Sequence, residues 1–223
     1  MTEQQEVMVP RIKRISKENK RIKIPTLNLL LVFFCVFLLI CATFIQLDIT
    51  HPIIPSNLFS GKHLVKADFF YTYSIIPQVP VVLFIVGLMG RKMGLTSIIL
   101  YILAGLCSLP IFAIGGGISY ITEPGFGYIL AYIPAAYFAG SILKEDFSFI
   151  NILKAGLVGV LIIHFVGIFY MLIVSIFRHH SWEYIKGWIL LQSVLKITYD
   201  YVLSLIALIV AKYGNKYIKY LLG

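Results

Sequence analysis

The sequence predicts an all-α polytopic membrane protein with six transmembrane helices and both termini in the cytoplasm. Of its 223 residues, 59% are hydrophobic and only 13% are charged, whereas about a quarter of the residues in a soluble domain are charged. Apolar runs of about 20 residues recur along the chain, which is the length that crosses a bilayer core. These runs lack the period-two alternation of a transmembrane β-barrel.

The first apolar run follows a polar segment, residues 1–25, that carries seven Lys and Arg residues. We expect this segment to be a cytoplasmic tail that lies on anionic lipid. A secretory signal peptide is the alternative, but its apolar core has about 7–15 residues. The run at 27–45 is longer and has no clear small-residue cleavage site, so we expect a retained helix.

The membrane domain is expected at residues 26–212, followed by a second basic cytoplasmic tail at 213–223. Pro77 and Pro80 should bend the second helix or delay its regular part. The six expected helices cover about 26–46, 73–88, 93–109, 127–143, 152–177 and 188–211, with polar loops at 47–70 and 178–187.

The basic residues between these helices indicate the orientation. The side that carries the first tail has 14 Lys and Arg residues, the opposite side has four, and Lys196 lies inside the last helix. Positive charge concentrates in cytoplasmic loops, so both termini are expected inside, and the loop at 110–126 faces outward. The net charge of +9 is thereby explained by topology and does not indicate nucleic acid.

Several classes of function are disfavoured. The three cysteines lie in apolar runs without the spacing of metal ligands. The chain shows no arrangement of nucleophile and base, and no phosphate-binding loop. We therefore expect neither an enzyme nor a metal site, and any ATP-driven transport would need another subunit to supply the ATPase.

The stretch at 90–140 organises the chain as two apolar helices joined by a loop with the triple glycine Gly115, Gly116 and Gly117. Glycine permits positive φ and close approach of the backbone to a ligand. The loop is therefore either a tight turn or one wall of a pocket.

Lys196 and Asp200 are charged residues at membrane depth, where charge is costly and usually functional or paired. They lie four residues apart on one helix face. One interpretation is an internal ion pair that holds helices together. The other is that Lys196 meets an anionic ligand group, with Asp200 tuning Lys196 or touching the ligand.

Further polar residues should converge with Lys196 in the outer half of the membrane. Gln78 could bind a ligand or satisfy backbone groups freed by the nearby prolines. Tyr101 is expected midway along its helix, and Ser193 in the first turns of the last helix. A mostly apolar pocket with a few placed polar groups suits a small molecule. His164, alone in its helix, is expected to be a packed residue with one local hydrogen bond, and the glycines at 156, 159 and 167 should allow close helix packing.

The sequence resembles the biotin-uptake (BioY-like) family, the substrate-binding S components of energy-coupling factor (ECF) transporters. The resemblance is good over residues 73–140, and Lys196 carries it into the last helix. Gln78 falls on a family glutamine and Lys196 on a family lysine. The other matching positions are Gly90, Arg91, Gly94, Tyr101, Gly105, Leu109, Pro110, Phe112, Ala113, Gly115, Gly116, Gly117, Pro124, Gly127 and Tyr128.

Three departures from the family pattern stand out. Ser193 occupies a position that is often Asp, and Gly125 and Phe126 replace a Thr and a Gly. The first helix is bulky where a pattern of small residues often docks the coupling subunit. The change at Ser193 bears on the specificity for biotin, and the bulky first helix bears on docking to a partner.

The resemblance implies a protein of the cytoplasmic (inner) cell membrane that binds biotin from outside as its transported substrate, without a cofactor. A transmembrane coupling subunit and two ATPase subunits would energise uptake. The biotin carboxylate would meet Lys196, and the ureido group would meet Gln78, Ser193 and the backbone of the glycine loop. Tyr101, Phe112 and Tyr128 would wall the fused rings. The alternatives are an S component for another small vitamin and a membrane interaction protein without transport.

Overall fold

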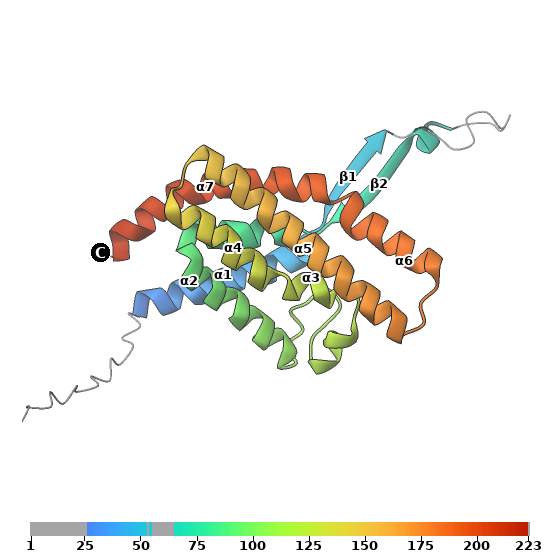
Figure 1. Cartoon of the computed structure of the whole chain (residues 1–223), viewed down its shortest axis with the longest axis horizontal. Coiled ribbons are helices and arrows are strands. Elements are labelled where there is room, and N and C mark those ends of the chain that lie inside the picture. The colour runs from blue at the N-terminus through green and yellow to red at the C-terminus, as the bar shows by residue number, and fades with distance from the viewer. Residues whose placement is uncertain (1–25, 53, 55–64, 223) are drawn as a thin grey trace, which may run out of the picture.

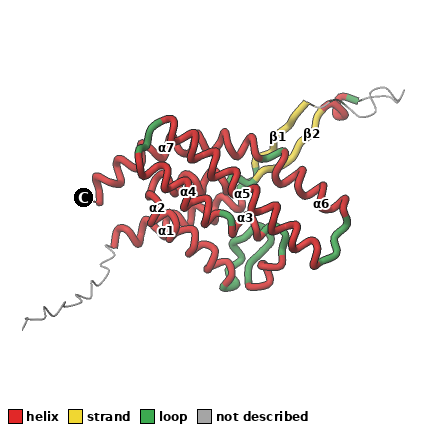
Figure 2. Tube along the Cα trace, viewed as in Figure 1, coloured by secondary structure: helices red, strands yellow, loops and turns green. Residues whose placement is uncertain are grey.

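The computed structural model of the chain describes residues 26–52, 54 and 65–222 (Figure 1). The predicted tail at 1–25 therefore lies outside the described residues. The chain forms a bundle of helices with one β-ribbon at its edge (Figure 2). The helices are α1 (Thr26–Phe44), α2 (Gln78–Leu106), α3 (Phe126–Leu130), α4 (Tyr132–Glu145), α5 (Phe149–Phe177), α6 (Trp182–Ile189) and α7 (Ile197–Leu222), with short 3₁₀ turns at Lys66–Phe69 and Ile118–Thr122.

Within the described residues, five helical segments are long and apolar enough to cross a membrane. They confirm the prediction of a helical membrane protein at this level. The segments are Thr26–Phe44, Gln78–Leu106, Phe126–Glu145, Phe149–Phe177 and Trp182–Ile218.

The helix α2 folds back on itself at Gly90. Gly90 has φ 73° and ψ 171°, which is outside the helical region. The amide Nε2 of Gln78 lies 3.0 Å from the hydroxyl of Tyr101, although 23 residues of straight helix would separate them by about 34 Å. The two halves of α2 therefore run antiparallel, and they correspond to the two helices expected at 73–88 and 93–109.

The expected start of the second helix at Tyr73 was wrong. Residues Leu47–Pro52 (β1) and Phe70–Ile75 (β2) pair as an antiparallel ribbon, with Ile49 opposite Tyr73. The run Phe-Tyr-Thr-Tyr at the start of β2 consists of aromatic and β-branched residues that favour strands. Helix begins only at Gln78, so the prolines delay it as predicted. The expected loop at 47–70 is thus partly strand.

The last helix is longer than predicted and is interrupted. The hydroxyl of Ser181 caps α6 by accepting a hydrogen bond from the N–H of Tyr184 at 3.2 Å, so most of the expected loop at 178–187 is helical. A π-helical turn, Leu190–Val194, joins α6 to α7. Because α7 continues to Leu222, the residues expected to form the second tail are helical as far as 222, and their cytoplasmic location stays a prediction.

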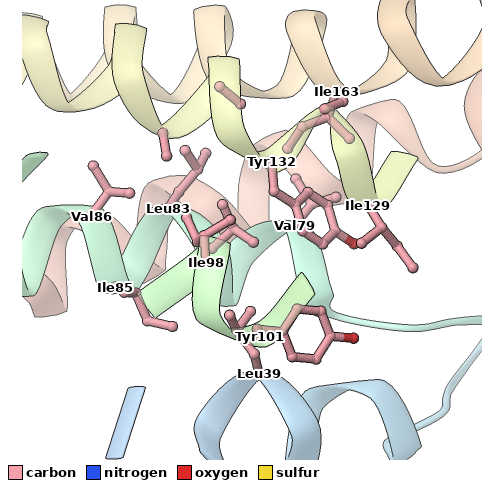
Figure 3. Close-up of a cluster of buried hydrophobic side chains, with 14 of the residues drawn as sticks. Leu39, Val79, Leu83, Ile85, Val86, Ile98, Tyr101, Ile129, Tyr132 and Ile163 are labelled. Carbon is pink, nitrogen blue, oxygen red and sulfur yellow. The ribbon is translucent and has the colours of Figure 1, made fainter. Parts of the chain in front are cut away.

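Glycines bring the helices into contact around the core. A Cβ on Gly159 would lie 2.6 Å from the side chain of Leu83, and one on Gly167 would lie 2.5 Å from the ring of Tyr128. A Cβ on Gly156 would lie 3.0 Å from the side chain of Leu205. The predicted packing role of these glycines is therefore confirmed. Figure 3 shows the buried side chains that fill the space between these helices, among them Leu39, Leu83, Ile98 and Ile163.

The position of Gly105 tests this packing. A Cβ there would lie 2.1 Å from the ring of Phe112, which is only 1% exposed and has no room to retreat. We expect Gly105→Ala to destabilise the protein by about 1–3 kcal/mol through overpacking. Thermal unfolding of the purified protein in detergent measures the effect.

Gly187→Ala is the matched control, because a Cβ at this helical glycine meets nothing within 4 Å. It should leave the unfolding temperature unchanged or raise it slightly, since Ala favours helix. Equal losses in both variants would contradict the packing account.

Candidate functional site

A cavity of about 210 Å³ lies between the start of α2, the segment 113–132, α5 and the junction of α6 with α7. Its walls are mostly apolar, with a few polar side chains, which is typical of a small-molecule site. Figure 1 shows this region on the side of the bundle away from the start of α1 and the end of α7. The lining residues are Ile76, Gln78, Val79, Ala113, Ile114, Tyr120, Glu123, Gly125, Tyr128, Ile129, Tyr132, His164, Trp188, Gln192, Lys196 and Asp200.

Gln78 joins three helices at one edge of the cavity. Its Nε2 donates to Thr43 Oγ1 at 2.6 Å and to Tyr101 Oη at 3.0 Å, and its Oε1 accepts from Tyr132 Oη at 2.9 Å. Both amide protons are therefore used, and only one lone pair of Oε1 remains for a ligand. The amide bonds side chains and not the backbone groups freed by the prolines, so that interpretation of Gln78 was wrong.

His164 connects α5 to the last helix. Its Nδ1 lies 3.0 Å from Ser193 Oγ and its Nε2 lies 3.1 Å from Asp200 Oδ2. Tyr128 Oη lies 2.8 Å from the same serine oxygen. The prediction of a single local hydrogen bond for His164 was wrong, because both of its partners come from a distant part of the chain.

One assignment of the protons satisfies each of these contacts. Tyr128 donates to Ser193, Ser193 donates to Nδ1 of His164, and the Nε2–H of His164 donates to the Asp200 carboxylate. The three residues His164, Ser193 and Asp200 are each at most 3% exposed. This chain fixes the depth and rotation of the last helix beside the cavity.

Lys196 is left without an acidic partner. Among the described residues, no carboxylate lies within 4 Å of its ammonium, which donates a hydrogen bond to Gln192 Oε1 at 3.4 Å. The interpretation of Lys196 and Asp200 as an ion pair was therefore wrong, since Asp200 pairs with His164. The Asp200 carboxylate acts on Lys196 only at longer range. An ammonium in an apolar bundle with no carboxylate in contact is costly, so the cavity favours an anionic ligand group.

Two more polar atoms at the cavity lack partners. Within the described part of the chain, Oδ1 of Asp200 is buried and makes no hydrogen bond, and the buried indole Nε1 of Trp188 lies near the Tyr128 hydroxyl without a hydrogen bond of good geometry. Buried polar atoms are usually hydrogen-bonded. With Lys196 they offer a ligand one cation, one neutral donor and one acceptor.

The π-helical turn Leu190–Val194 shapes this wall. It directs Ser193 inward to His164 and Tyr128, while Val194 beside it is 57% exposed. Such turns occur mainly at functional sites. Here the turn comes directly before Lys196.

The triple glycine forms a tight turn and not a cavity wall. Gly115 and Gly117 have φ values of 123° and 97°, and a Cβ on Gly116 would lie 2.0 Å from the carbonyl oxygen of Leu109. The turn is closed by paired backbone hydrogen bonds between Phe112 and Gly115. Ala113 and Ile114, at its tip, line the cavity instead.

The loop at residues 118–125 is attached to the end of α5 by hydrogen bonds. Arg178 Nη2 donates to Thr122 Oγ1 at 2.8 Å and to Glu123 Oε1 at 3.2 Å, and Tyr170 donates to the carbonyl of Ile121. Burial raises the pKa of Tyr120 in this loop, which keeps its hydroxyl protonated at the edge of the cavity.

The predicted site residues thus fall into two groups. Four of them line the cavity: Gln78, Tyr128, Lys196 and Asp200. The other six do not line it and lie in the layer behind the lining residues. Tyr101 and Ser193 bond to lining residues, while Phe112 packs on Tyr101 and Tyr120 ahead of the glycine turn. The lining residues that the sequence did not single out as ligand contacts include Tyr120, Tyr132, His164 and Trp188.

A sequence profile of the BioY family matches residues 16–220 of the chain. The chain belongs to the BioY family. It is 30% identical over 148 residues to a probable biotin transporter BioY of Lysinibacillus sphaericus, covering 61% of this chain and 74% of that protein. It is 33% identical over 82 residues to the biotin transporter BioY of Thermotoga maritima, covering 36% and 48% of the two proteins.

The fold of this BioY-family chain is also similar to a crystal structure of the S-component for biotin from an ECF-type ABC transporter. The TM-score is 0.62 at 19% identity, over 86% of this chain and 92% of the other. The resemblance inferred from residues 73–140 is therefore confirmed. Membership of a transporter family also confirms that the chain is not an enzyme.

Tyr132→Phe should loosen the site. The change removes the donor to Gln78 Oε1 and leaves a partly buried amide oxygen unpaired, which costs about 1 kcal/mol. We expect a lower unfolding temperature for the purified protein.

Tyr137→Phe, on the same helix, is the control, because Tyr137 is 48% exposed and its hydroxyl has solvent as an alternative partner. Its unfolding temperature should equal that of the wild type. If Tyr132→Phe also behaves as the wild type, Gln78 does not hold the helices together.

Proposed function

We propose that this BioY-family chain binds biotin in the 210 Å³ cavity and takes it up across the cytoplasmic membrane as the S component of an ECF-type transporter. The observation that carries the proposal is the unpaired Lys196 ammonium in a mostly apolar cavity. Biotin has one carboxylate, which would give Lys196 the direct acidic contact that no described residue provides. The names of the relatives support the same substrate.

The rest of biotin is complementary to the remaining groups. Its ureido ring has two N–H donors and one carbonyl acceptor, and Asp200 Oδ1 and Trp188 Nε1 are an unpaired acceptor and donor. Tyr128, Ile129 and Tyr132 give apolar surface for the fused rings. Thiamine, a cationic vitamin, would be repelled by Lys196, so the charge of the site favours biotin over it.

We propose six membrane crossings, with the cavity open to the outside. The reversal at Gly90 turns one long helical segment into two antiparallel passes. The start of α1 and the end of α7 lie on the same side of the bundle (Figure 1), as an even number of passes requires. The 14-to-4 distribution of basic residues supports a cytoplasmic location for that side. A coupling subunit and two ATPase subunits would act there.

Calorimetric titration of the full chain in detergent tests the proposal. Biotin should bind saturably at about one per chain. Lys196→Gln should weaken binding by about 10- to 100-fold, the range expected when a hydrogen bond to a charged group is lost. Biotin methyl ester should bind the wild type about as weakly as biotin binds Lys196→Gln. The affinity of the ester should be the same for the wild type and for that variant.

Lys186→Gln is the control, because Lys186 is exposed, lies over Trp182 and does not line the cavity. It should bind biotin within twofold of the wild type. If the folded wild-type protein does not bind biotin, the proposed substrate is refuted. Equal affinity for biotin and its ester would refute the role of Lys196.

A further inference from the structure

A second cavity, of about 410 Å³, lies at the other end of the bundle. It is formed around the reversal at Gly90, the last turns of α4, the connection to α5 and the late part of α7. No residue lines both cavities. The second cavity is therefore separate from the proposed biotin site.

The charges around this cavity are all positive. Arg91, Lys92 and Lys144 line it, and no acidic residue does. None of the three makes an ion pair with any described residue, although Glu145 follows Lys144 directly in the chain. Such a cluster of cations lacks the counter-charge that would offset its mutual repulsion.

Arg91 is held in place beside the cavity. Its Nη1 donates to Ser141 Oγ at 2.9 Å, and its guanidinium lies 5.0 Å from the centroid of the Tyr137 ring. No other hydrogen bond joins this guanidinium to a side chain in the described ranges. A fixed guanidinium is well suited to bidentate contact with a phosphate.

The remaining wall is apolar. Met89, Leu143, Phe147 and Ile218 contribute to it. The cavity lies where the two halves of α2 and the helices α4 and α5 are connected. With the six proposed crossings, this end of the bundle meets the lipid headgroups. A ligand here meets cations on one side and hydrocarbon surface on the other.

We propose that this cavity binds an anionic phospholipid, with its phosphate on Arg91, Lys92 and Lys144 and its acyl chains along the apolar wall. The chain's own first segment is a poor occupant, because residues 1–25 carry seven basic and three acidic residues. A free phosphate ion would leave the apolar wall uncovered. Basic pockets between transmembrane helices are known to bind lipid headgroups.

Native mass spectrometry of the full chain, released from detergent with added lipid, tests this directly and does not involve biotin. Phosphatidylglycerol should be retained at about one per chain, at least fivefold more than phosphatidylcholine with the same acyl chains. The variant Arg91→Gln/Lys92→Gln/Lys144→Gln should retain at least fivefold less phosphatidylglycerol than the wild type.

The matched control is Lys154→Gln/Lys212→Gln/Lys216→Gln, which removes three exposed charges that do not line the cavity. It should retain the lipid within twofold of the wild type. If the first variant fails to fold, the variant Lys92→Gln/Lys144→Gln keeps Arg91 and its contacts. It should still retain at least threefold less phosphatidylglycerol than the wild type.

Three results would overturn the proposal. One is equal loss in the cavity and control variants, and another is equal retention of the two lipids. The third is competition by inorganic phosphate at the lipid's own concentration, which would indicate a site for a free anion. Each of these results leaves the proposed biotin site untouched.

Discussion

The contact between His164 and Asp200 is the interaction on which the site depends. It joins α5 to the last helix at 3.1 Å in a place where both side chains are almost fully buried. Removing one partner of this hydrogen bond is destabilising, because the other is left buried and unpaired. The contact also occupies the carboxylate that stands one helical turn from Lys196. The cation is thereby left free for a ligand, and Ser193 and Tyr128 complete the same chain of hydrogen bonds.

Gln78 connects helices at another edge of the cavity. Its amide joins α1, both halves of α2 and α4, and this is possible only because α2 reverses at Gly90. Glycine at φ 73° permits that reversal without steric cost. The same reversal places Arg91 and Lys92 at the far end of the bundle, beside the second cavity. One backbone feature therefore shapes both sites.

Much of this arrangement could be predicted from the sequence. Helix length led to the helical membrane fold and the motif at residues 90–140 led to the correct family, while the orientation inferred from the basic residues stays a prediction. The depth of Lys196 indicated a charged group in the bundle. The stripe Trp188, Gln192, Lys196 and Asp200, with a spacing of four, contained a signal that could have added Trp188. The partner of Asp200 could not be predicted, because His164 lies 36 residues away on another helix. Local spacing also could not show that the glycines form a turn behind the cavity, or that β2 would extend to Ile75.

The central claim is that biotin occupies the cavity beside Lys196, and the emission of Trp188 tests it most directly. The chain has two tryptophans, and Trp182 is 59% exposed and outside the cavity. In a Trp182→Phe variant all indole emission comes from Trp188, which lines the cavity. The account predicts a saturable change in that emission on titration with biotin, at the same midpoint as calorimetric binding. Saturable calorimetric binding with unchanged Trp188 emission would contradict it and place biotin elsewhere.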